Sequence, residues 1–327
     1  MTASPHDREL VIRPLTGPDE LALFRTLPYV LDHELADDLA NGLRRPEWMW
    51  VALRGDRVLA RAAWWAPGPG SAAPYMLDFF DLDDSLPEPE RGETGLQLLE
   101  TAMARLFPGG TERPEYGRYV PPDWRTDPVA RDTVEARTRV LERTGARLLV
   151  ERLRLEWTPG TAVPEPSGRL VFRAVRDRED LVSLMARVVE GTLDAHSLAA
   201  QASGLSPRAA AEQQYDEELT GYRSPREWWR IAELPDGEPV GFVIPARNNY
   251  HAIIAYIGVL PGHRGRAHID EILAEGTRIL AAEGVPRIRA ATDLGNVPMA
   301  RAFERAGYAN FERELNLVWD PPPGESA

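Results

Sequence analysis

The alternation of apolar and polar positions predicts the same kind of fold for each half of the chain. In the second half, two apolar runs, Trp228–Leu234 and Glu238–Ala246, flank Pro-Asp-Gly, which is typical of a β-hairpin. A third run, His251–Leu260, predicts a further strand. After it, apolar residues recur at the helical spacings of three and four, at Ile269, Ile272, Leu273, Ile279 and Leu280. The pattern predicts an α+β fold in which helices flank a mixed, largely antiparallel sheet.

The two halves are tandem copies of one plan. A constant offset of 162 residues aligns Leu141–Trp157 with Phe303–Trp319 and gives six identities without a gap. Between the copies, Thr158–Gly168 is rich in Pro and Gly, as a linker would be. We therefore predict one domain over residues 1–157, a linker over 158–169 and a second domain over 170–327.

Composition narrows the function further. The formal charge of −13 argues against a general affinity for nucleic acid or an anionic membrane. The chain has no Cys, which excludes disulfides, thiolate nucleophiles and Cys-ligated metals. No second His or carboxylate stands at ligand spacing, so we expect no metal site. The first residues lack the apolar core of a signal peptide, and we expect a soluble, cytoplasmic monomer or homodimer.

The most informative stretch is the turn "VLPGHRGRAH", residues Val259 to His268, between a predicted strand and a predicted helix. Such a turn combines free backbone N–H groups, a helix N-terminus and guanidinium charge, which together bind phosphate. Gly265 and Ala267 let the backbone approach an anion, and Arg264 and Arg266 supply charge. The Gly-Lys-Ser/Thr of a P-loop and the G-x-G-x-x-G of a dinucleotide fold are both absent. A solvated basic turn is the alternative interpretation.

These residues resemble the signature of the GNAT superfamily of acetyl-CoA-dependent N-acetyltransferases. The family has V-x-P followed by Q/R-x-x-G-x-G/A; here Val259 to Pro261 precede Gly262 to Ala267, with Gly262 where the family has Gln or Arg. A second family element, an Asn before a helix that ends in Gly and an aromatic, matches Asn296, Gly307 and Tyr308. The resemblance covers most of residues 170–319. Asn296 could also act only as a helix N-cap.

The resemblance implies two tandem GNAT-like domains and a site for acetyl-CoA without a metal. Pantetheine would pair with backbone near Ile257 and Val259, between two strands that splay apart. A backbone N–H would polarise the thioester, and a primary amine would attack it directly in a ternary complex. The residues expected to bind the cofactor are Ile257, Gly258, Val259, Gly262, His263, Arg264, Gly265, Arg266, Ala267, His268, Asn296 and Phe303.

The groups that move protons are harder to predict. Many family members have a Tyr seven residues after the Asn, as general acid, and here that residue is Phe303. On the central strand, alternation puts Ile253, Ala255 and Ile257 on one face, without a base, and Tyr256 on the other.

The region between the first strand and the hairpin differs most between the halves, and in it Asp194 and His196 are the candidates for binding and deprotonating the amine. Alternatively, Asp194 caps a helix and His196 is exposed. Tyr256 and Glu227 are the next candidates.

The first half repeats the scaffold without this chemistry. Seven carboxylates and one Arg lie between Asp78 and Glu93, a field that would repel pyrophosphate, and the offset puts Val134 where the second half has Asn296. We expect this half to serve packing or to shape the acceptor site.

The sequence thus predicts an N-acetyltransferase whose acceptor stays open among antibiotics, polyamines, metabolites and protein N-termini. Two other classes remain. A non-catalytic acetyl-CoA-binding module is favoured by Phe303, and an aminoacyl-tRNA-dependent transferase is disfavoured by the negative charge.

Overall fold

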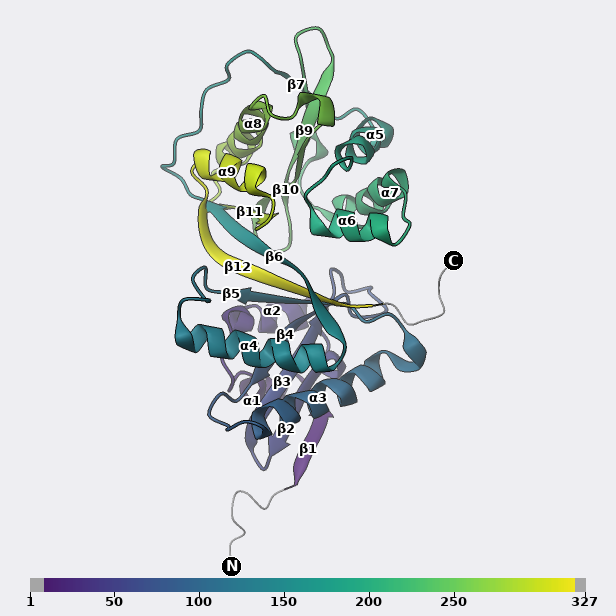
Figure 1. Cartoon of the computed structure of the whole chain (residues 1–327), viewed down its shortest axis with the longest axis vertical. Coiled ribbons are helices and arrows are strands. Elements are labelled where there is room, and N and C mark those ends of the chain that lie inside the picture. The colour runs from purple at the N-terminus through teal and green to yellow at the C-terminus, as the bar shows by residue number, and fades with distance from the viewer. Residues whose placement is uncertain (1–8, 321–327) are drawn as a thin grey trace, which may run out of the picture. The chain divides into compact units, whose positions relative to one another are not determined.

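The computed structural model describes residues 9–320 and divides the chain into two compact units (Figure 1). The first unit is Met1–Leu149 with Glu314–Ala327, and the second unit is Val150–Arg313. Both are α+β, with helices that flank a mixed sheet. Within the described residues, no helix is long and apolar enough to cross a membrane.

The first unit contains a sheet in the order β1-β2-β3-β4-β5-β12. Strands β1 to β4 pair antiparallel, and β4 pairs with β5 in parallel. Its elements are β1 (Leu10–Pro14), α1 (Leu21–Phe24), α2 (Leu35–Ala40), β2 (Met49–Arg54), β3 (Arg57–Trp65), β4 (Met76–Leu82), α3 (Glu90–Leu106), β5 (Glu115–Val120), α4 (Pro128–Arg143) and the end of β12 (Ala309–Trp319).

The second unit contains the order β6-β11-β10-β9-β8-β7, with the beginning of β12 beside β6. The predicted hairpin is confirmed, because β8 and β9 pair antiparallel. Its elements are β6 (Ala146–Trp157, from Val150 onward), β7 (Val171–Ala174), α5 (Arg178–Val188), α6 (Ala195–Ala202), α7 (Pro207–Glu217), β8 (Arg230–Glu233), β9 (Pro239–Arg247), β10 (Ala252–Val259), α8 (His268–Ala282), β11 (Ile288–Asp293) and α9 (Val297–Arg305).

The division differs from the predicted boundaries at 157 and 170, because the last strand of each half joins the other unit. Strand β6 follows α4 in sequence but pairs antiparallel with β11, from Arg152↔Asp293 to Trp157↔Ile288. The end of β12 belongs to the first unit, where the Trp319 indole Nε1 donates to the Thr144 hydroxyl at 3.0 Å. The repeat identifies equivalent strands correctly, but a repeat carries no information on which sheet each strand enters.

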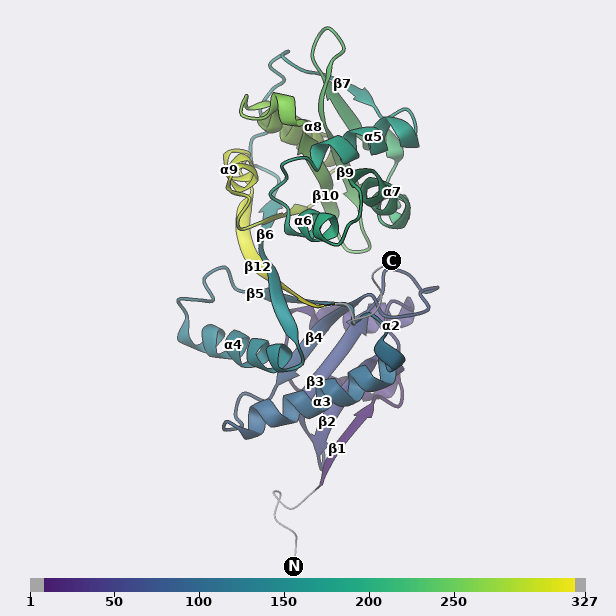
Figure 2. The same ribbon diagram turned by 45° about the vertical axis from the view of Figure 1, so that its right-hand side comes forward.

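Helices cover both faces of the sheet in the second unit (Figures 1 and 2). On one face, α8 and α9 pack through Leu273, Leu280 and Phe303 onto Ile254 and neighbouring strand residues. On the other face, α5 and α7 pack through Leu181, Met185 and Tyr215 onto Phe242 and Trp229. Of the apolar residues predicted to share one face of α8, Ile272, Leu273 and Leu280 belong to this core, whereas Ile269 and Ile279 are half-buried beside it.

Strand β10 separates from β11 near its middle. The two strands pair in parallel only at Ala252↔Ile288 and Ile253↔Arg289, so the predicted splay is confirmed. Opposite β9, the register of β10 shifts between Ile254 and Tyr256, which is a β-bulge.

The bulge breaks the alternation of side chains along β10. Ala255 and Tyr256 both pack toward α5 and α7, whereas Ile257 packs toward α8. The prediction that Ala255 and Ile257 share a face is therefore wrong, because it assumed regular strand pairing.

Candidate functional site

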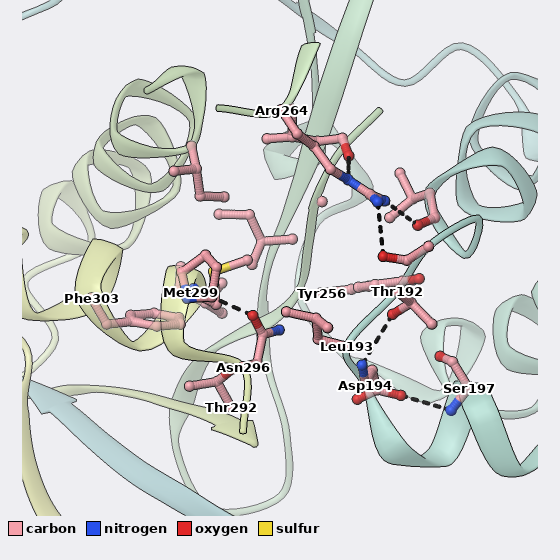
Figure 3. Close-up of a pocket in the computed structure, with 18 of the residues that line it drawn as sticks. Thr192, Leu193, Asp194, Ser197, Tyr256, Arg264, Thr292, Asn296, Met299 and Phe303 are labelled. Atoms are coloured by element: carbon pink, nitrogen blue, oxygen red, sulfur yellow. Dashed lines mark hydrogen bonds between the residues drawn. The ribbon is translucent and has the colours of Figure 1, made fainter. Parts of the chain in front are cut away.

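A cavity of about 450 Å³ opens where β10 and β11 separate. Its walls come from the end of α5, the segment that leads to α6, strand β10, the loop before α8, strand β11 and α9. Figure 3 shows Phe303 and Met299 on the α9 side of the cavity and Asp194 and Ser197 on the opposite side. All of these residues belong to the second unit.

The loop between β10 and α8 presents a row of backbone donors. After a 3₁₀ turn over Pro261–His263, Gly265 and Ala267 take left-handed backbone conformations with φ of 76° and 60°. For a residue with a Cβ this conformation costs roughly 1–2 kcal/mol. Within the described chain, the N–H groups of residues 265–269 donate to no acceptor. Consecutive free N–H groups at a helix N-terminus suit an anion such as a pyrophosphate.

Space around the loop is compatible with this use. A Cβ added to Gly262 or Gly265 would meet no atom within 4 Å, so Gly262, the departure from the GNAT signature, faces open space. Gly265 and Ala267 line the cavity, whereas Gly262 and Arg266 do not. Arg266 is exposed, and its side chain makes no hydrogen bond or ion pair within residues 9–320.

The Arg264 side chain is held in a way that the sequence did not predict. A guanidinium group has five N–H groups, and here four of them reach backbone carbonyls. Nε donates to Val259 at 3.1 Å, Nη1 to Glu190 at 2.7 Å and Gly191 at 3.0 Å, and Nη2 to Val188 at 2.6 Å. Three of these four hydrogen bonds are therefore accepted by carbonyls at or just after the end of α5. Arg264 nevertheless lines the cavity.

Two buried histidines stand at the ends of the loop. His263 and His268 line the cavity, and within the described structure neither Nδ1 atom has a hydrogen-bond partner. His263 Nε2 lies 3.2 Å from a Glu238 carboxylate oxygen. Burial lowers the pKa of His268, and the charges of Arg169 and His263 lower it further. Each Nδ1 atom is itself inaccessible, so the two histidines shape this part of the cavity through other atoms of their rings.

Asn296 and Phe303 lie on α9. Asn296 lines the cavity, and its side-chain oxygen accepts the Met299 N–H at 3.4 Å, so the capping interpretation is confirmed. Phe303 is 1% exposed, packs edge-on against Tyr308 with ring centroids 5.1 Å apart, and also lines the cavity. Its ring has no proton to donate at the position where the resembling family has Tyr.

The opposite wall of the cavity is polar. Asp194 caps α6, because its Oδ1 accepts the Ser197 N–H at 2.8 Å, and its own N–H donates to the Thr192 hydroxyl at 3.1 Å. Capping by Asp194 is thus confirmed, and Asp194 also lines the cavity. The other half of that alternative, an exposed His196, is wrong, because His196 is half-buried. Tyr256 packs on the α5 and α7 side of β10, opposite Ile257 as alternation predicted, and it also lines the cavity. Burial raises its pKa far above the usual value, and the charges of Asp194 and Glu218 add to the shift, so the phenol is protonated at neutral pH.

Of the other acceptor-site candidates, His196 and Glu227 do not line the cavity. His196 is half-buried. Within the described residues, no group of three or more His, Asp or Glu could hold a metal ion.

Asp293, at the end of β11, is a site-forming residue that the sequence analysis missed. It is 3% exposed, and its Oδ2 accepts the Ala195 N–H at 2.7 Å, which ties the start of α6 to β11. Its Oδ1 lies 3.2 Å from Nε of Arg152, which lines the cavity. Burial raises the pKa of Asp293, and the charge of Asp194 adds to this effect. The signal in the sequence was that Asp293 is an acidic residue at the end of the predicted apolar strand that became β11.

The equivalent place in the first unit is occupied by arginine side chains. Strand β4 pairs with β5 only at Met76↔Glu115 and Leu77↔Tyr116, the same short parallel pairing as β10 with β11. Beyond it, Arg118 donates to the Phe80 carbonyl at 3.1 Å and Arg137 to the Leu82 carbonyl at 3.0 Å. Backbone groups next to the gap are therefore satisfied by the chain itself.

The predicted repulsive field of the first half is wrong in its physical basis. Each of the seven carboxylates between residues 78 and 93 lies within 4.0 Å of a guanidinium group. Asp81, for example, is buried with Arg61 and Arg118, whose charges outweigh desolvation and lower its pKa. Nearly all of these arginines come from other parts of the sequence, so counting charges along one stretch overestimated the negative field.

Comparison with known proteins agrees with this fold. Residues 195–308 match the family model described as "Acetyltransferase (GNAT) family". A mycothiol acetyltransferase from Frankia casuarinae is 25% identical over 191 residues, which cover 55% of this chain and 53% of that protein. The match thus spans about half the length of that relative.

Two solved structures share the fold over nearly the whole chain. A GCN5-related N-acetyltransferase from Sphaerobacter thermophilus has a TM-score of 0.62 and 17% identity, covering 96% of both chains. A tandem GNAT protein from the clavulanic acid biosynthesis pathway has a TM-score of 0.51 and 18% identity, covering 97% of this chain and all of the other. At these identities the likeness concerns the fold, and the fold is that of two tandem GNAT-like domains.

Proposed function

From the premise that this chain carries a domain of the GNAT acetyltransferase family over residues 195–308, we propose that it transfers an acetyl group from acetyl-CoA to a primary amine. One observation carries the proposal: a single cavity joins a row of free backbone N–H groups to a wall with a carboxylate and a phenol. The first feature suits a diphosphate and the second suits an ammonium group.

The loop would hold the anionic part of acetyl-CoA. The N–H groups of residues 265–269 donate to no acceptor among the described residues, and His263 and His268 line the same part of the cavity. Strand β10 beyond Ile253 has no pairing to β11, so its backbone is available to pantetheine along the gap. Acetyl-CoA supplies the activated acetyl group as a thioester, and backbone N–H near the bulge would stabilise negative charge on the carbonyl oxygen during attack.

The opposite wall would receive the amine. Only Oδ1 of Asp194 is used in capping; within the described residues its Oδ2 accepts no hydrogen bond and can hold an ammonium group. The protonated phenol of Tyr256 is a hydrogen-bond donor on the same wall. The ammonium group first gives a proton to solvent, and the neutral nitrogen then forms a bond to the acetyl carbon. The carbon–sulfur bond breaks with its electron pair on sulfur, so that CoA leaves as a thiolate, and the nitrogen releases its second proton to solvent or to that thiolate. A thiolate is a tolerable leaving group near neutral pH, which is compatible with Phe303 in place of an acid.

The absence of Cys makes the experiment simple. A thiol reagent added to a mixture of protein, acetyl-CoA and an amine reports only CoA, since the chain has no thiol of its own. The panel includes hydroxylated amines, because hydroxyls of Thr192, Ser197 and Tyr256 stand near Asp194 on the cavity wall. We expect thiol release that depends on one class of amine. Tight acetyl-CoA binding without release for any amine would instead favour the non-catalytic binding module.

A further inference from the structure

Arg264 connects the two parts of the cavity to which we assign different functions. Its backbone belongs to the loop with free N–H groups, and its side chain reaches Val188–Ala195, which we name the acceptor segment because it leads to the Asp194 carboxylate. The loop and the acceptor segment are more than 60 residues apart in sequence. Arg264 therefore makes a direct physical connection between the anion-binding part of the cavity and the wall proposed for the amine.

The contact is extensive for one side chain. Three carbonyls accept from the guanidinium at 2.6 to 3.0 Å, that of Val188 at the end of α5 and those of Glu190 and Gly191 just after it. Carbonyls at a helix C-terminus have no partner within the helix and attract positive charge. The fourth bond, from Nε to Val259, anchors the same group to the end of β10. A planar fork with several donors can span these acceptors, whereas a single ammonium group cannot.

Two glycines, Gly191 and Gly258, leave room for this arrangement where other atoms come very close to their backbone. A Cβ at Gly191, which has φ of 62°, would lie 3.3 Å from Nη1 of Arg264. A Cβ at Gly258 would lie 2.6 Å from a methyl group of Val188, closer than real Cβ contacts. The end of α5 is thus packed directly against β10, and the guanidinium occupies the space beside Gly191.

The remainder of the acceptor segment is lightly held. Gly191 and Leu193 are exposed, and the Thr192 N–H donates locally to the Val189 carbonyl at 3.1 Å. The far end is fixed where the Ala195 N–H meets Asp293. With Arg264 at one end and Asp293 at the other, the position of Asp194 depends on both ties.

We propose that Arg264 is a positioning residue that couples acetyl-CoA binding to the order of the acceptor segment. An anion held on the N–H groups of residues 265–269 restricts the loop, the restricted loop fixes the Arg264 side chain, and the side chain fixes the carbonyls at the end of α5. The amine-binding wall is then ordered when acetyl-CoA is bound. This inference rests on the proposed function, because it requires that the loop bind acetyl-CoA.

Amide hydrogen exchange with saturating CoA as the probe tests the coupling without knowledge of the acceptor. In the parent protein, CoA slows exchange in residues 262–269 and also, by about fivefold or more, in the acceptor segment. In Arg264→Met the loop is still protected, but the acceptor segment changes by less than about twofold on CoA addition. Arg264→Lys gives an intermediate effect, because it keeps the charge and loses the fork.

The matched control is Arg266→Met, which removes a guanidinium two residues away that makes no hydrogen bond or ion pair with any residue from 9 to 320, the acceptor segment included. Protection of the segment must survive in this variant. Protection of the segment in Arg264→Met equal to that in the parent would overturn the coupling. Absence of loop protection in the parent itself would instead contradict the proposed cofactor site, so the two failures are distinguishable.

Discussion

Substitutions of Asp194 separate its observed role, capping α6, from its proposed role, binding the amine. Asp194→Asn keeps a side-chain oxygen at the N-cap and removes the negative charge. Asp194→Ser also keeps a capping oxygen, because Ser, Asn and Asp are equivalent caps to a first approximation. Asp194→Ala removes both the cap and the charge. The series therefore varies capping and charge independently at one position.

The structure sets the size of each effect. The cap is one hydrogen bond from Ser197 N–H to Oδ1 at 2.8 Å, and losing such a cap costs about 1 kcal/mol. For a unit of this size that corresponds to a fall in Tm of roughly 2–4 °C. Losing a charge-assisted contact between Oδ2 and an ammonium group costs about 1.5–3 kcal/mol, or roughly tenfold to a hundredfold in kcat/KM.

Thermal unfolding and steady-state kinetics on the responsive amine measure the two effects. We expect Asn and Ser to keep the parent Tm within about 1 °C while KM for the amine rises and KM for acetyl-CoA is unchanged. Ala shows the same kinetic change with the lower Tm. If Asn retains the parent KM for the amine, Asp194 is only a cap and the amine binds elsewhere.

Three further predictions concern other parts of the molecule. Burial, and then the charge of Asp38, raise the pKa of Glu34 to about 7. The folded state therefore prefers the neutral acid, and the free energy of unfolding falls as the pH rises from about 4.5 to 7. We expect Glu34→Gln to raise Tm at pH 8 but not at pH 4.5. An equal gain at both pH values would show that charge is not the cause. Phe303→Tyr adds a hydroxyl to a ring that lines the cavity, so we expect an unchanged fold by circular dichroism and thiol release equal to or above that of the parent; unfolding would mean that the ring edge has no access to the cavity. Gly258→Ala forces a Cβ against Val188 and should cost about 1–3 kcal/mol in a denaturant titration, a value that a cost below about 0.5 kcal/mol would contradict.

Local patterns predicted the local structure of the site well. Helical spacing from Ile269 to Leu280 located α8, and the turn chemistry from Pro261 to Ala267 identified the loop whose N–H groups are free. These features depend on residues close together in sequence, where periodicity and turn preferences act directly.

What the sequence did not predict depends on partners distant in sequence. The bulge at Ala255 is set by pairing with β9, and it turned Ala255 to the face of β10 that carries Tyr256. The bonds of Arg264 depend on where α5 ends, and the neutralisation of Asp81 depends on Arg61 and Arg118. In each case the partner belongs to a different helix or strand from the residue whose position or charge it determines.

Calorimetric titration with acetyl-CoA tests the central claim most directly, because the cavity proposed for acetyl-CoA is open in the second unit and the equivalent gap in the first unit is occupied by Arg118 and Arg137. The account predicts one binding site for acetyl-CoA per chain. A control titration with an amine alone is expected to give no comparable heat of binding. Two equivalent sites per chain, or no binding at all, would contradict it.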